Sequence, residues 1–152
     1  MNQDVPQIGR SLNLLFWVLT VVALIFLGIG YLLHRMNIEI PTPFGSLRAW
    51  GILLLLLSVI LGVALPVLLR TLFNKRVVEE KHVELVLFVA HQKRLVVVSV
   101  SAAYAACIAY LLMVPNLYLY GSVLAGLYGI YSAIPSERKL KGELRFYGLG
   151  GK

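Results

Sequence analysis

The stretch LNLLFWVLTVVALIFLGIGYLL, residues 12–33, decides the fold because it holds no charged residue and no histidine. At about 1.5 Å per residue, a helix of this length crosses the roughly 30 Å hydrocarbon core of a bilayer. Three more apolar stretches of spanning length follow, at about residues 50–69, 95–114 and 117–133. A spanning segment must be helical, since an open strand would leave its backbone groups unpaired in lipid. The sequence therefore predicts an all-α integral membrane protein built as a four-transmembrane-helix bundle.

The composition of the whole chain supports a membrane environment. Hydrophobic residues make up 59% of the 152 residues and charged residues 14%, and the mean hydropathy is +0.83. A soluble domain carries about 25% charged residues. No segment between the spans is long enough for a core of its own, so we expect a single membrane domain over residues 1–152. The one cysteine, Cys107, cannot form an intramolecular disulfide, and we expect it to pack as a small apolar side chain.

Lysine and arginine residues are distributed unevenly about the four spans, and this distribution predicts the orientation. Two of the 14, Arg35 and Arg48, fall on one side of the membrane and the other twelve fall on the opposite side. Because the side richer in Lys and Arg is cytoplasmic, both termini are predicted to be cytoplasmic (N-in/C-in). The twelve are Arg10, Arg70, Lys75, Arg76, Lys81, Lys93, Arg94, Arg138, Lys139, Lys141, Arg145 and Lys152.

The first apolar stretch and the net charge bear on localisation and partners. The stretch exceeds the roughly 7–15 apolar residues of a signal peptide, so we expect an uncleaved anchor. A short chain without organelle-targeting features favours a bacterial plasma (inner) membrane. The net charge of +7 is expected to attract anionic lipid headgroups to the cytoplasmic face. We expect no nucleic-acid partner, because the chain lacks a basic surface with exposed stacking aromatics.

The segment between the second and third spans, at about residues 74–94, is unusual for a loop. Its first half is charged, whereas Val83 to Ala90 holds only one polar residue, Glu84. We predict a short cytoplasmic interfacial helix here, between helices 2 and 3. Two alternatives remain open, namely an extension of the third helix and a β-hairpin around His91-Gln92. The C-terminal segment, residues 135–152, is predicted to be a cytoplasmic tail.

The fourth apolar stretch carries a pattern of small residues. They recur every four positions, which lets another helix approach closely. We expect the third and fourth spans to pack on each other through these faces, and self-association or docking of a partner protein is the alternative. The residues on the fourth stretch are Gly121, Ser122, Ala125, Gly126, Gly129 and Ala133, and those on the third are Ser101, Ala105 and Ala109.

Two further sets of residues are candidates for a functional role inside the membrane. Pro66 lies within the second span and is predicted to kink it, which makes it a hinge candidate. Four hydroxyl groups of the third and fourth spans are candidates for lining a substrate path, although buried hydroxyls more often satisfy one another or the backbone. These four are Tyr104, Tyr110, Tyr128 and Tyr131.

A metal site is the weakest hypothesis that the sequence offers. Glu79 and His82 form a Glu-x-x-His pair, with Glu84 nearby. Di-metal carboxylate bundles use two such pairs and two further Glu residues, whereas this chain has one pair. Charges beside a membrane are usually solvated, so we predict no metal and no cofactor.

The spans contain no ionisable side chain of the kind that transporters use to couple ion movement. The sequence also shows no catalytic triad and no phosphate-binding loop. We therefore predict a non-catalytic accessory or scaffolding subunit that acts through helix contacts and membrane-surface contacts, with a homo-oligomer or a membrane-protein partner. A small oligomeric transporter or channel with a Tyr/Ser-lined path is the alternative, and a metal-dependent membrane enzyme is the third.

Overall fold

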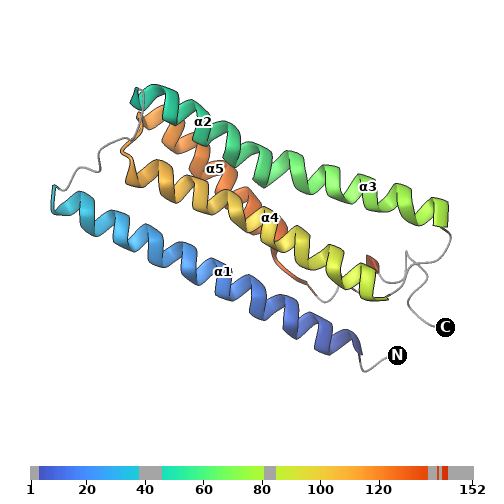
Figure 1. Ribbon diagram of the computed structural model, residues 1–152. Helices are drawn as coiled ribbons and strands as arrows, with labels where there is room; N and C mark the ends of the chain where they lie inside the picture. Colours follow the sequence, from blue (N-terminus) through green and yellow to red (C-terminus); the bar gives the residue numbers. More distant parts are fainter. Residues whose placement is uncertain (1–3, 38–45, 81–84, 137–139, 141, 144–152) are drawn as a thin grey trace.

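The computed structural model describes residues 4–37, 46–80, 85–136, 140 and 142–143 of the chain. The long regular elements of this described part are all helical (Figure 1). The π-helix η1 joins α2 to α3 without a break, so the elements form four long rods. Their bounds are α1 Asp4–Arg35, α2 Leu47–Val59, η1 Ile60–Ala64, α3 Leu65–Glu80, α4 Leu85–Leu111 and α5 Asn116–Ala133. The prediction of an all-helical fold is confirmed.

Helix α4 is the centre of the bundle. It packs along α5, α1 and α2, and it also contacts η1 and α3. Figure 1 shows α1 on one side of α4 and the rod of α2, η1 and α3 on the other, with α5 beside α2. Helix α1 has substantial contact with α4 alone. The other helices therefore form a tighter group, to which α1 is added through a single neighbour.

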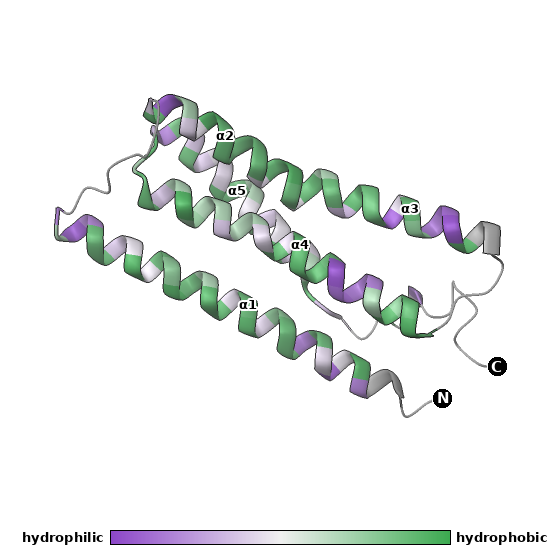
Figure 2. Ribbon diagram, in the orientation of Figure 1, coloured by the Kyte–Doolittle hydropathy of each residue, from purple (hydrophilic) through white to green (hydrophobic). Residues whose placement is uncertain are grey.

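Three of the rods are long and apolar enough to cross a membrane. They comprise Gln7–Arg35, Leu47–Val77 and Leu85–Leu111, and Figure 2 shows that hydrophobic residues predominate along them. The chain is therefore compatible with an integral membrane protein. Helix α5 has 18 residues, including four tyrosines, three glycines, two serines and an asparagine, and it is not among these three candidate spans. Its role as a fourth span stays a prediction.

The segment between the second and third predicted spans differs from its prediction. Helix α3 continues to Glu80, and α4 begins at Leu85 and runs unbroken past His91 and Gln92. Residues 85–94 are thus the first turns of α4, so neither a separate interfacial helix nor a β-hairpin forms there. The physical reason is packing, because Phe88 is fully buried against α1 rather than resting on a membrane surface.

One end of the bundle, which we call the basic end, carries most of the described basic side chains. Helices α1 and α4 begin there and α3 ends there (Figures 1 and 2). The other end, which we call the opposite end, carries Arg35 and Arg48. The basic end holds Arg10, Arg70, Lys75, Arg76, Lys93 and Arg94.

The buried apolar residues form two clusters, one toward each end. The cluster toward the opposite end is built from Leu54, Ala109 and Val114, of α2, α4 and the α4–α5 turn, and α1 contributes nothing to it. Helix α1 therefore contributes large buried side chains at the basic end, whereas farther along it buries the small residues Ala23 and Gly30. The cluster at that end comprises Leu12, Phe16, Phe88, Val96, Val100, Ala133 and Leu140.

Candidate functional site

The predicted small-residue faces lie where α4 and α5 meet. A Cβ atom added to Gly126 would be 3.2 Å from the Cα atom of Ala103, and one added to Gly129 would collide with the carbonyl oxygen of Ser99. The two backbones thus approach as closely as glycine permits. In a membrane the lipid tails are as apolar as the helices, so the hydrophobic effect does not drive helices together. Dispersion contact between closely approaching backbones stabilises such a pair instead.

The same face of α5 also receives α2 and η1. A Cβ atom on Gly121 would lie 2.6 Å from Leu55 Cδ1, and one on Gly62 would lie 2.6 Å from the carbonyl oxygen of Ala125. Helices of this chain therefore cover the small residues of α5, and a partner protein would need another surface. Of the predicted packing set, Gly121 and Ser101 are half-buried, and the buried members are Ser122, Ala125, Gly126, Gly129, Ala133, Ala105 and Ala109.

Pro66 is the second residue of α3, two positions after the π-helix η1 ends at Ala64. It has no backbone N–H, and its ring would clash with the carbonyl of Gly62 in a regular α-helix. The π-helix accommodates this conflict, and the N–H of Leu65 donates to the carbonyl of Ile60, five residues earlier. Pro66 indicated in the sequence that the helix would be distorted. The sequence did not predict that the distortion is a π-helix, or that it lies about one turn before the proline. The hinge role itself stays a prediction.

Three buried hydroxyl groups in the described part of the chain have no hydrogen-bond partner. They belong to Thr20, Ser58 and Ser122. Both serines are fully buried, on α2 and α5, and they lie between the Leu55–Gly121 and Gly62–Ala125 contacts. An unpaired buried hydroxyl costs about 1–3 kcal/mol. Our sequence prediction missed Thr20 and Ser58, although polar residues inside an apolar stretch are the signal that marks them.

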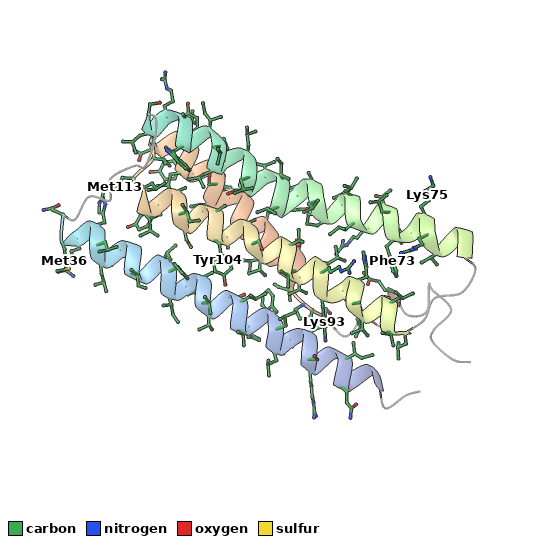
Figure 3. The ribbon with its side chains drawn as sticks, in the orientation of Figure 1. Met36, Phe73, Lys75, Lys93, Tyr104 and Met113 are labelled. Carbon is green, nitrogen blue, oxygen red and sulfur yellow. The ribbon has the colours of Figure 1, made fainter. Side chains whose placement is uncertain are left out.

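The four tyrosines proposed for a polar path are not brought together. Tyr104 donates a hydrogen bond to the carbonyl of Leu19 on α1 at 2.7 Å, and Figure 3 shows its side chain between α4 and α1. Tyr110 lies toward the opposite end of the bundle, with its ring centroid 6.1 Å from that of His34 on α1. Tyr128 and Tyr131 lie exposed on α5. The four hydroxyl groups therefore line no common path within one chain, and a path between protomers stays a prediction.

Side chains of α4 join α1 to the rest of the bundle at three levels. Besides the hydrogen bond from Tyr104, the thiol of Cys107 lies 3.4 Å from the carbonyl oxygen of Ala23. Closer to the opposite end, Tyr110 packs on Gly30, and a Cβ atom added to Gly30 would lie 3.1 Å from the tyrosine ring. Cys107 is buried, and it also contributes a weak hydrogen bond that the sequence gave no means to predict.

At the basic end, residues near the C-terminus return to the bundle. Leu140 is buried in the core cluster there, and the amide of Gln92 hydrogen-bonds the carboxylate of Glu143. The rings of Phe73 and His91 stack with their centroids 4.0 Å apart and link α3 to α4. These contacts anchor the first turns of α4 from two sides.

The metal hypothesis falls outside the part of the chain that the structure describes. His82 and Glu84 are not among the described residues, and neither is the side chain of Glu79. Among the residues that are described, no three His, Cys, Asp or Glu side chains gather in a way that could hold a metal ion.

Comparison of the chain with protein-family models, with curated proteins and with solved structures gives no match in any of the three cases.

Proposed function

We propose that this protein is a non-catalytic accessory or scaffolding subunit of a membrane complex. The observation that supports this proposal most is the way the interior is filled. Gly126 and Gly129 bring the backbones of α4 and α5 into contact, and Gly62 brings η1 onto both helices. A bundle packed backbone to backbone serves as a rigid scaffold, and it leaves little room for a path between its helices.

In this role the bundle lies in a bacterial plasma membrane, with its basic end in the cytoplasm. Twelve of the 14 basic residues of the sequence lie toward that side in the four-span topology. Each basic residue near an anionic surface contributes about 1 kcal/mol of attraction. The basic end would therefore rest on anionic headgroups and fix the depth of the bundle.

The outer face of α1 is the surface that we propose for a partner helix. Helix α1 packs along α4 and shares a core cluster with Ala133 and Leu140 at the basic end, and the small-residue face of α5 lies against other helices of the chain. The outer face carries large apolar side chains over its whole length. They include Leu14, Val18, Val21, Ile25, Ile29 and Leu32.

Photo-cross-linking in the native membrane tests this surface. A photoreactive residue replaces Ile25 on α1 or, as a matched control, Leu53 on α2; these side chains are 55% and 53% exposed. We expect a protein adduct of defined mass from position 25 and only lipid adducts from position 53. Lipid adducts at both positions would contradict α1 as the docking surface.

A small oligomeric transporter is the second candidate, and the fully buried hydroxyls of Ser58 and Ser122 favour it. Ser58 lies just before the π-helix, where a change of helix register would alter the surroundings of its hydroxyl. Proton or monovalent-cation flux into liposomes containing the purified chain tests this candidate. Flux that Ser58→Ala and Ser122→Ala abolish would establish transport in place of the accessory role.

A further inference from the structure

A lateral groove runs between α1 and α5, with α4 as its floor. Because neither cluster of buried residues holds α1 and α5 together along their middle turns, the two helices leave a gap with a free volume of about 120 Å³. Small side chains of α4, such as Ala103 and Ala106, form the floor. The walls are apolar and include Leu24, Leu27, Val123 and Leu127.

The groove lies at the depth of the hydrocarbon core. Its α1 wall extends from Thr20 to Leu27. At about 1.5 Å per residue, these positions lie roughly 22 Å and 12 Å along α1 from Arg35, where the helix ends. With a core about 30 Å thick, the groove covers the middle of the bilayer and the part nearer the opposite end. Only apolar material is available to fill it there.

A basic group lies above the groove on the same face of α1. Thr20, Leu27 and His34 are spaced seven residues apart, so they share one face of the helix. His34 and Arg35 form the last turn of α1 and are both exposed. His34 also lies beside Tyr110 of α4, at the α1–α4 junction, about one turn beyond the point where Tyr110 packs on Gly30.

We propose that the lateral groove binds one acyl chain of a membrane phospholipid whose phosphate group is held by His34 and Arg35. The charge at the end of α1 complements a phosphate, and the apolar groove below it complements the chain. The distance of roughly 22 Å from Arg35 to the level of Thr20 suits a chain that runs from the headgroup toward the bilayer centre.

The size of the groove favours an acyl chain over a partner helix. An α-helix with its side chains is about 10–12 Å across and rises about 1.5 Å per residue, so a free volume of about 120 Å³ corresponds to one helical residue. At about 30 Å³ for a group the size of a methylene or a water molecule, the same volume takes a run of about four methylenes of an acyl chain, whose remaining length lies over the groove in the bilayer. A helix could only lie across the mouth of the groove.

The first test measures phospholipid retained by the full-length chain after exhaustive exchange into a mild detergent. We expect about one phospholipid per chain by mass spectrometry. Val123→Phe places a ring in the groove and is expected to reduce retention at least fivefold, or about 1 kcal/mol. The matched control is Leu124→Phe, the next residue on α5, which is 67% exposed and points outside the groove. We expect it to retain lipid like the unmodified chain.

The second test concerns the headgroup and does not alter the packing of the groove. Arg35→Gln is expected to lower retention about fivefold, or about 1 kcal/mol, because one phosphate contact is lost. Arg48→Gln removes the other arginine of the opposite end and is expected to have no effect. This pair keeps the proposal falsifiable if the phenylalanine variant fails to fold.

Three results would overturn the proposal. The first is an unmodified chain that retains no phospholipid above the detergent background. The second is equal retention by each variant and its control. The third is a photoreactive group at position 123 that attaches to a second polypeptide, or to a second copy of the chain, instead of to a lipid.

Discussion

The hydroxyl of Tyr104 on α4 donates a hydrogen bond of 2.7 Å to the backbone carbonyl of Leu19 on α1. These two residues lie 85 positions apart in the chain. Their hydrogen bond joins α1 to α4, the helix along which α1 packs. Phe26 of α1 meets the same tyrosine ring edge-on, with centroids 6.1 Å apart. Tyr104 therefore fixes the middle of α1 to the rest of the bundle through both its hydroxyl group and its ring.

Loss of this hydroxyl is expected to loosen α1. We predict that Tyr104→Phe lowers the free energy of unfolding by about 0.5–1.5 kcal/mol, the usual net value of one hydrogen bond. Unfolding by titration with a denaturing detergent measures the change. Tyr131→Phe is the control, because Tyr131 is 74% exposed, and it is expected to have no effect. Equal stability of both variants would show that the hydrogen bond does not hold α1.

The close approach of α4 and α5 gives a second prediction. Gly129→Ala brings a Cβ atom against the carbonyl of Ser99, and we expect a loss of about 1–3 kcal/mol of stability from overpacking. Gly28→Ala is the matched control, since nothing lies within 4 Å of a Cβ atom at that position. The control is expected to be neutral or stabilising by up to about 1 kcal/mol. A neutral Gly129→Ala variant would contradict the close packing of α4 on α5.

The buried hydroxyl of Ser122 gives a third prediction. Because it has no partner, Ser122→Ala is expected to be neutral or to stabilise the fold by about 1 kcal/mol. Ser101→Ala removes a hydrogen bond of 2.7 Å to the carbonyl of Val97 and is expected to destabilise by about 0.5–1 kcal/mol. Thermal unfolding in detergent compares the two. A marked loss of stability for Ser122→Ala would mean that this hydroxyl binds something inside the membrane, which would favour the transporter.

The position of α5 gives a fourth prediction. If α5 is the fourth span, single cysteines replacing the exposed residues Gln7 and Ser136 react from one side of the membrane, and one replacing Asn116 reacts from the other. Labelling of inside-out and right-side-out vesicles with a membrane-impermeant thiol reagent checks this, with Cys107 replaced by serine. Labelling of positions 116 and 136 from the same side would refute the four-span topology.

Much of the fold could be predicted from the sequence because spanning length and the lack of charge decide helix formation in a membrane. The contacts between helices could be predicted only where small residues mark a close approach, as at Gly126 and Gly129. Apolar helices have no polar face to show which side is buried. For this reason the sequence could not show that α1 meets only α4, or that Tyr104 reaches Leu19.

The boundaries within residues 74–94 were not predictable for a related reason. The apolar residues of 85–90 suit an interfacial helix and an extension of α4 equally well in sequence. Burial of Phe88 against Leu12 and Phe16 of α1 decides between them, and this is a contact between residues far apart in the chain. The π-helix before Pro66 was not predictable for the same reason. Gly62 at its centre packs on α4 and α5, and these contacts also join residues far apart in the chain.

Purification from the native membrane in a mild detergent, with mass spectrometry of the intact assembly, tests the accessory role most directly. We predict that the chain is recovered with a defined protein partner at fixed stoichiometry, and that substitution of Ile25 on the outer face of α1 by a charged residue releases that partner. Recovery of the chain alone or as a homo-oligomer, together with ion flux in liposomes, would contradict the accessory role and establish a transporter instead.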